Sequence, residues 1–187
     1  MTKLIGLVGM AGSGKGEVAK ILVSDFKFVE LSMSRPMKEF CKKIFEFSDE
    51  ALYGSSELRN TELRTGLTPR YALQTLGDWG RALDQDCWIN YFLKYAKSNL
   101  ECGEQVVVSD LRFQRELERI KEEIPESEMW LISRPALIKK HWIHKHKSEL
   151  LEIDERLFDK VISNDSDLIV LKEKVTTAFQ PQFSPPE

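Results

Sequence analysis

Residues 6–20 read GLVGMAGSGKGEVAK, and this stretch decides the fold. An apolar run over residues 3–8 leads into the glycine-rich segment 9–16, after which apolar residues recur at helical spacing up to Phe26. A continuous apolar run of this kind is typical of a strand buried on both faces of a parallel sheet. In the order strand, G-x-x-x-x-G-K, helix, the glycines let backbone N–H groups turn around phosphate oxygens at a helix N-terminus. The sequence therefore predicts a phosphate-binding loop (P-loop).

The loop departs from the common pattern at one place. A Ser or Thr normally follows the lysine and gives its hydroxyl to Mg²⁺, whereas Gly16 and Glu17 follow Lys15 here. Because Mg²⁺ keeps several waters and draws most of its ligands from phosphates, the site need not be lost. The G-K-G ending resembles the loop of nucleoside monophosphate kinases such as adenylate kinase. The residues expected to bind ATP here are Gly12, Ser13, Gly14, Lys15, Gly16 and Glu17, with Lys15 also a candidate catalytic residue.

The glycine segment has two other interpretations. One is an ordinary glycine-rich turn that contains a lysine. The other is a GTPase, which the sequence disfavours because residues 110–113, DLRF, lack the glycine of D-x-x-G. Asp165 likewise stands where the guanine-binding N-K-x-D motif has its lysine.

Strands and helices alternate along the rest of the chain. Further strands are expected at residues 28–31, 104–110, 128–133 and 159–165. Helices are expected from Pro36, from Pro69, and over residues 87–100, 114–123, 135–146 and 167–179, with a long polar loop at 54–67. Asp86 is expected to cap the helix that begins at residue 87. The alternation predicts an α/β fold, a P-loop NTPase three-layer domain whose parallel sheet has helices on both faces.

Length and composition limit the classes of function. A chain of 187 residues fits a single domain, expected over residues 1–180, with an acceptor-binding helical insert at about 34–100, a lid at about 134–150 and a flexible tail at 181–187. The net charge of −3 argues against a nucleic-acid binder, and no apolar run is long enough to span a membrane. Three scattered cysteines fit a reducing, cytoplasmic location. The sequence leaves monomer and homodimer open.

A kinase needs a second set of cations to hold the acceptor phosphate beside the transferred group. On a helix from Pro69, Arg70, Gln74 and either Asp78 or Arg81 can share one face. Two arginines could grip a phosphate, and an amide could contact a base edge. An amphipathic helix with solvated arginines is the alternative.

Six segments occur in an order that resembles the bacteriophage-type deoxynucleoside monophosphate kinases. They are SRPMKEF (34–40), LYG (52–54), TPRYALQTLGDWGR (68–81), WI (88–89), VVVSDLRFQRELE (106–118) and HKSE (146–149). The resemblance implies a P-loop kinase that uses ATP and Mg²⁺ to convert a deoxynucleoside monophosphate to the diphosphate, with small nucleotides as its substrates. The alternatives are another small-metabolite kinase, such as one acting on dephospho-coenzyme A, and a nucleotide-binding accessory protein without turnover.

The resemblance also implies roles for single residues. Lys38 would reach the acceptor or transferred phosphate, Arg70 and Arg81 would hold the acceptor phosphate, and Gln74 would lie against the base. Asp110, at a strand end, would organise Mg²⁺ through water, and Arg112 would stabilise charge on the transferring group. Arg35 is a departure, because a small or acidic residue is more usual there.

The segment after the strand at 128–133 is basic. Arg134, Lys139 and Lys140 are expected to form a lid over the ATP phosphates, with a solvated basic helix as the alternative. His141, His144 and His146 do not fall together on one helical face, which disfavours a metal site. Asn164 follows the last predicted strand, where related kinases place a loop near the adenine, so the resemblance implies that it binds ATP there, unless it is a plain turn residue.

Overall fold

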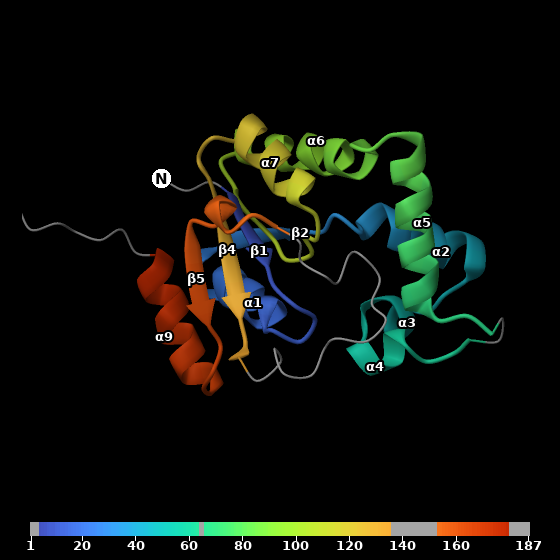
Figure 1. Cartoon of the computed structure of the whole chain (residues 1–187), viewed down its shortest axis with the longest axis horizontal. Coiled ribbons are helices and arrows are strands. Elements are labelled where there is room, and N and C mark those ends of the chain that lie inside the picture. Colours follow the sequence, from blue (N-terminus) through green and yellow to red (C-terminus); the bar gives the residue numbers. More distant parts are fainter. Residues whose placement is uncertain (1–3, 64–65, 136–152, 180–187) are drawn as a thin grey trace, which may run out of the picture. The chain divides into compact units, whose positions relative to one another are not determined.

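The computed structural model describes residues 4–63, 66–135 and 153–179 (Figure 1). The chain divides into two compact units. The first is formed by the chain up to Glu30 and from Gly103 onward, and the second by Leu31–Cys102. The glycine loop belongs to the first unit, and the predicted acceptor residues belong to the second.

The first unit alternates strands and helices. Its elements are β1 (Leu4–Val8), α1 (Lys15–Phe26), β2 (Phe28–Leu31, whose last residue belongs to the second unit), β3 (Gln105–Val108), α7 (Gln114–Glu123), β4 (Ser127–Ser133), the 3₁₀ turn η2 (Glu155–Leu157), β5 (Lys160–Ser163) and α9 (Leu168–Phe179). The second unit is helical. Its helices are α2 (Arg35–Phe45), α3 (Asp49–Tyr53), α4 (Ser56–Arg59), α5 (Pro69–Leu83) and α6 (Cys87–Glu101).

The five strands form one sheet in the order β2-β3-β1-β4-β5. β1 runs parallel to β3 on one side, with Ile5 beside Val107, and parallel to β4 on the other, with Leu7 beside Trp130. β4 and β5 are also parallel. Every residue of β1 is buried, as expected for a central strand covered on both faces. The predicted parallel sheet is confirmed.

Helices cover both faces of this sheet. α1 and α9 pack on one face, where their apolar residues share a core with alternate residues of the strands (Figure 1). That core contains Ile5, Leu7, Val18, Leu22, Val107, Trp130, Ile132, Ile162, Leu171 and Val175. α7 covers the other face, toward which Gly6 and Met129 point, and buries Leu117 and Ile120 there. The predicted three-layer arrangement is confirmed.

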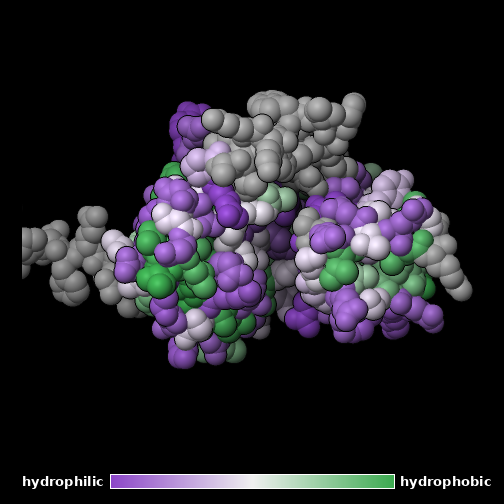
Figure 2. All heavy atoms as spheres, turned by 90° about the horizontal axis from the view of Figure 1, so that it is seen from below, coloured by the Kyte–Doolittle hydropathy of each residue, from purple (hydrophilic) through white to green (hydrophobic). Residues whose placement is uncertain are grey.

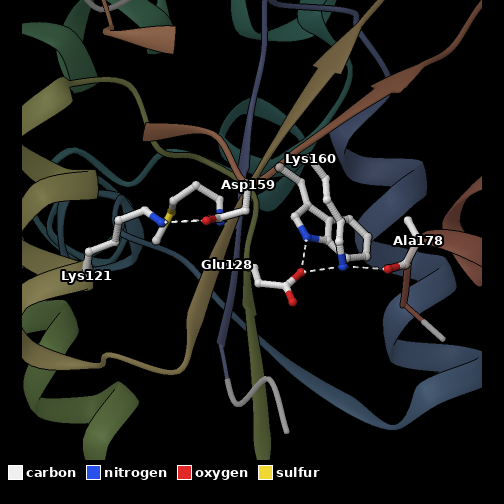
Figure 3. A network of polar contacts seen from close by, with 7 residues as sticks. Lys121, Glu128, Asp159, Lys160 and Ala178 are labelled. Atoms are coloured by element: carbon white, nitrogen blue, oxygen red, sulfur yellow. Dashed lines mark hydrogen bonds and ion pairs between the residues drawn. The ribbon is translucent and has the colours of Figure 1, made fainter. Parts of the chain in front are cut away.

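A network of charged side chains fixes the edge of the sheet where β4 and β5 begin (Figure 3). The ammonium of Lys160 donates to Glu128 Oε2 over 2.8 Å and to the carbonyl oxygen of Ala178, near the end of α9, over 2.6 Å. The indole of Trp130 donates to the same carboxylate oxygen over 2.7 Å. A cation and an anion, each half-buried, therefore join β4, β5 and α9.

Asp159 completes this network next to β5 (Figure 3). Its carboxylate accepts from Lys121 Nζ of α7 at 2.7 Å and from the backbone N–H of Met129 at 2.7 Å. Its own backbone N–H donates to the Met129 carbonyl oxygen over 2.8 Å. These bonds lie at the amino ends of the strands, so they stabilise the edge opposite to the glycine loop.

In the second unit, α5 begins as the sequence predicts. Thr68 is the N-cap, its hydroxyl accepting from the N–H of Tyr71 at 3.1 Å, and Pro69 occupies the first turn. α5 and α6 then interlock, because Trp88 Nε1 donates to the Gly77 carbonyl oxygen over 3.0 Å. A Cβ at Gly80 would lie only 2.4 Å from the Trp88 ring, so α6 packs where α5 has no side chain.

The predicted boundaries hold to the residue for 28–31 and 114–123, and α1 ends at Phe26, where the helical spacing after the glycine loop ends. One expectation is wrong, and another holds for its position but not for its bond. The predicted loop 54–67 contains the single-turn helix α4, whose cap Ser55 accepts from the N–H of Leu58 at 3.2 Å. Asp86 stands at the N-cap of α6 but makes no capping bond with its side chain. Asp84 instead accepts from the N–H of Asp86 at 2.9 Å and shapes the preceding turn. The predicted helix 135–146 beyond Pro135 and the tail 181–187 lie outside the described residues.

The surface mixes hydrophobic and hydrophilic side chains (Figure 2). In the first unit the exposed apolar residues include Leu168 and Ile169 at the start of α9, and in the second they include Ile44 and Phe45 of α2. Within the described ranges, none of the helices combines the length and the hydropathy that a bilayer crossing requires.

Candidate active site

The loop between β1 and α1 holds its shape through two glycines. Gly14 has φ of 103°, a left-handed conformation that favours glycine, and a Cβ there would lie 2.2 Å from Asn164 Nδ2. A Cβ at Gly9 would lie 2.4 Å from the Ile132 carbonyl oxygen. The N–H of Ser13 donates to the Met10 carbonyl oxygen over 3.1 Å, closing the loop on itself. The backbone therefore leads directly into the N-terminus of α1, where N–H groups and the helix dipole favour anions.

Lys15 lies folded along this loop and is only 6% exposed. Its ammonium donates to the carbonyl oxygens of Gly9 and Met10 over 2.6 and 2.9 Å. Phosphate oxygens are charged acceptors and form stronger hydrogen bonds with an ammonium than neutral carbonyls do. Lys15 can therefore exchange these carbonyls for a phosphate without leaving the loop.

Three further side chains, from residues that follow β3, β4 and β5, reach the same loop. Arg112 Nη1 donates to the Gly9 carbonyl oxygen over 3.4 Å, and Arg134 Nη1 donates to that of Gly12 over 3.3 Å. Asn164 Nδ2 donates to the Ser13 carbonyl oxygen over 2.9 Å. These side chains meet because the carboxyl ends of parallel strands lie at one edge of the sheet.

The structure thus brings together the predicted loop residues with Arg112, Arg134 and Asn164. Lys139 and Lys140, the other predicted lid residues, and the histidines at 141, 144 and 146 lie outside the described residues.

Asp110 and Arg112 belong to a turn between β3 and α7 that Glu116 holds. Glu116 is only 8% exposed, and its Oε2 accepts from the N–H groups of Arg112 and Phe113 at 2.7 and 3.1 Å. Such a bond from the first turn of a helix back to the preceding backbone is half of a capping box. Sequence reasoning missed this role of Glu116, although a glutamate three residues after the turn is the signal that could have shown it.

The residues around the loop fit a hydrated Mg²⁺ better than a metal held by protein alone. Among the residues that the structure describes, no three His, Cys, Asp or Glu side chains come together as a metal site. Glu17 pairs with Lys20 at 2.8 Å, and half-buried Asp110 is two residues before Arg112, which contacts the loop. A Cβ at Gly16 would meet nothing within 4 Å, so packing leaves room at the loop mouth. An ion that takes phosphate and water ligands suits this donor set.

The loop after β5, which carries Asn164, is itself pinned. Lys174 Nζ of α9 donates to the Ser163 carbonyl oxygen over 2.8 Å and to Asp165 Oδ1 over 2.7 Å. The hydrogen bond from Lys174, assisted by that from the Ser163 hydroxyl, lowers the pKa of the Asp165 carboxyl from 3.8 to about 2. The Asn164 N–H donates to the Ser133 carbonyl oxygen over 2.7 Å.

The predicted acceptor residues on α5 share one face of that helix, though they are spread along it. Arg70 and Arg81 are about three turns, or roughly 16 Å of helix rise, apart, with Gln74 between them. Arg70 Nε donates to Asn60 Oδ1 over 2.7 Å, and Arg81 Nη2 donates to Asp78 Oδ1 over 2.8 Å. Both arginines can reach one phosphate only if their side chains extend toward each other along the helix.

α2 contributes the fourth predicted acceptor residue. The ammonium of Lys38 lies 4.5 Å from the centroid of the Tyr53 ring on α3, a cation–π contact. Arg35, the residue that departs from the resemblance, pairs with Glu39 one turn later at 2.7 Å. This pair is exposed and raises the pKa of Arg35, so an ordinary helix-surface ion pair accounts for that residue.

The sequence has a named relative. No family model matches the chain. A protein of Acanthamoeba polyphaga mimivirus, described as "Putative deoxynucleotide monophosphate kinase", is 36% identical over 132 residues, which are 64% of this chain and 68% of the relative. The chain belongs to the deoxynucleotide monophosphate kinase family. The predicted family is thereby confirmed, and this member is a phosphotransferase of the nucleoside monophosphate kinase type.

Solved structures similar to this kinase include a sugar kinase from Janibacter sp. HTCC2649, with a TM-score of 0.55 and 14% identity, covering 95% of this chain and 94% of the other. They also include the dephospho-CoA kinase from Campylobacter jejuni, with a TM-score of 0.55 and 12% identity, covering 95% of this chain and 96% of the other. At these identities the likeness concerns the fold alone, which is that of the P-loop kinases.

Proposed function

We propose that this kinase transfers the terminal phosphoryl group of ATP to a deoxynucleoside monophosphate, giving ADP and a deoxynucleoside diphosphate. The observation that carries the proposal is the convergence of Lys15, Arg112 and Arg134 on the carbonyl oxygens of one glycine loop at the N-terminus of α1. A triphosphate needs such a collection of cations and backbone N–H groups, and the named relative supports the acceptor class.

On the ATP side, the loop N–H groups bind phosphate oxygens while Lys15 and Arg112 neutralise the charge that spreads over the transferring group. Mg²⁺, when bound, would supply further neutralisation of the phosphate charge. Asp110 and Glu17 are the carboxylates that would hold it through its water ligands. Transfer of this kind needs positioning and charge stabilisation, with no covalent intermediate on the protein.

On the acceptor side, Lys38, Arg70 and Arg81 supply cations for the phosphate of the monophosphate, and the amide of Gln74 contacts the base. We place the reaction in the cytoplasm, in the host cell if the protein is viral, because its few scattered cysteines suit a reducing compartment.

The test is a coupled assay of ADP release with a panel of acceptors. The panel contains dAMP, dGMP, dCMP and dTMP, their ribonucleotide counterparts, dephospho-coenzyme A, and a reaction without acceptor. We expect release that depends on at least one deoxynucleoside monophosphate. Release with dephospho-coenzyme A alone, or release that does not depend on any acceptor, would contradict the proposed function.

A further inference from the structure

Asn164 makes a side-chain bond across the fold to the phosphate loop. Its Nδ2 donates to the Ser13 carbonyl oxygen over 2.9 Å, although the two residues are far apart in the sequence. Ser13 itself is 1% exposed, so this bond is shielded from solvent on the loop side. A shielded carbonyl oxygen that loses its donor carries the full cost of its own desolvation.

The amide and the loop are also complementary in shape. The position that a Cβ would take on Gly14 is 2.2 Å from Asn164 Nδ2 and 3.3 Å from its Cγ. Gly14 therefore leaves the space into which the amide fits, in addition to adopting the left-handed conformation.

This bond determines the direction of a ligand-binding group. In a trans peptide the C=O of one residue and the N–H of the next point in opposite directions. Holding the Ser13 carbonyl against Asn164 consequently aims the Gly14 N–H away from Asn164. Loop N–H groups at this position of a P-loop are those that surround phosphate oxygens.

Asn164 is a rigid support for this purpose. Its backbone N–H is bonded to the Ser133 carbonyl oxygen over 2.7 Å, and the residues on either side are held by Lys174. We propose that Asn164 is a positioning residue that braces the phosphate loop by fixing the Ser13–Gly14 peptide, and that it acts on the polyphosphate part of the nucleotide rather than on its base. This inference rests on the proposed role of the loop in binding ATP.

The test compares ATP, which has a nucleobase, with inorganic tripolyphosphate, which has none. Isothermal titration calorimetry on the full chain in the presence of Mg²⁺ measures the Kd of ATP and of inorganic tripolyphosphate for the parent, Asn164→Ala and Asn164→Leu. Leucine keeps the size of asparagine but has no donor, so it separates the hydrogen bond from the packing. We expect both variants to weaken both ligands by a similar factor of about five to ten, the loss typical of one hydrogen bond.

Ser166→Ala is the matched control, since it removes from the same loop a hydroxyl that donates to Asp165 Oδ1 over 3.3 Å. It should leave both Kd values unchanged. A loss confined to ATP would show that Asn164 contacts the base and would overturn the proposal, as would unchanged Kd values for both ligands. Urea unfolding of each variant checks that the fold persists. If the parent binds ATP but shows no acceptor-dependent turnover, the proposed reaction fails while the binding comparison still decides the role of Asn164.

Discussion

Replacing Gly80 with alanine should destabilise the second unit, although alanine is the better helix former. The new Cβ would lie 2.4, 2.6 and 2.7 Å from Cζ2, Cε2 and Nε1 of Trp88, and the helix backbone cannot retreat from it. Displacing the indole costs about 1–3 kcal/mol as overpacking, and loss of its bond to the Gly77 carbonyl oxygen costs about 1 kcal/mol more. The gain in helix propensity offsets about 1 kcal/mol. The net free energy of unfolding should fall by about 1–3 kcal/mol.

Gly77→Ala on the same helix is the matched control. There the nearest atom to the new Cβ is the terminal Nη2 of Arg81 at 3.2 Å, the far end of a flexible side chain that can move by a few tenths of an ångström. Gly77→Ala should therefore be neutral or stabilising by up to about 1 kcal/mol. Urea unfolding followed by far-UV circular dichroism measures both variants. If Gly80→Ala is as stable as the parent, or if both variants lose stability equally, the interlocking of α5 and α6 is not as described.

Asp110→Asn should lower kcat by about two orders of magnitude, because one preorganised electrostatic contact is worth about that much. It should also raise the Mg²⁺ concentration that the reaction requires, which a Mg²⁺ titration of the rate would show. Glu116→Ala should lower kcat because it removes the acceptor that holds the turn carrying Arg112. Glu116→Gln keeps an acceptor oxygen and should retain most of the parent kcat. Equal losses in the two variants would show that Glu116 does not act by holding this turn. Because folding lowers the pKa of the Asp165 carboxyl, its ionised form adds to the free energy of unfolding above the unfolded pKa of 3.8, and this contribution is lost as pH falls toward about 2. Acid unfolding of Lys174→Met should lack this contribution.

The glycine loop and the residues at the strand ends could be predicted because their placement follows from local patterns. A strand followed by G-x-x-x-x-G-K locates the loop, and the parallel sheet brings Arg112 and Asn164 to the same edge. Which atoms they would touch did not follow. The bond of Asn164 to the Ser13 carbonyl oxygen depends on how β5 packs beside β4, and nothing in the local sequence specifies it.

In the second unit, the contacts of the segment from Thr68 to Arg81 likewise could not be predicted from the sequence. Residue spacing places Arg70, Gln74 and Arg81 on one face of α5 and fixes their separation along it. It does not show which partners they bond, Asn60 for Arg70 and Asp78 for Arg81. The sequence does not identify Gly80 as a packing residue, because only the fold shows that the Trp88 ring lies where its Cβ would be. The helix α4 was missed since a single turn capped by Ser55 has no periodicity to detect.

The most direct measurement of the central claim identifies both products of one reaction. The parent and Lys15→Ala are incubated with ATP, Mg²⁺ and a deoxynucleoside monophosphate, and the nucleotides are separated by anion-exchange chromatography. The account predicts that the parent forms deoxynucleoside diphosphate and ADP in equal amounts, and that Lys15→Ala forms at least about a hundredfold less of both because its charge stabilises the transferring group. ADP that appears without the deoxynucleoside diphosphate, or equal product from Lys15→Ala, would contradict it.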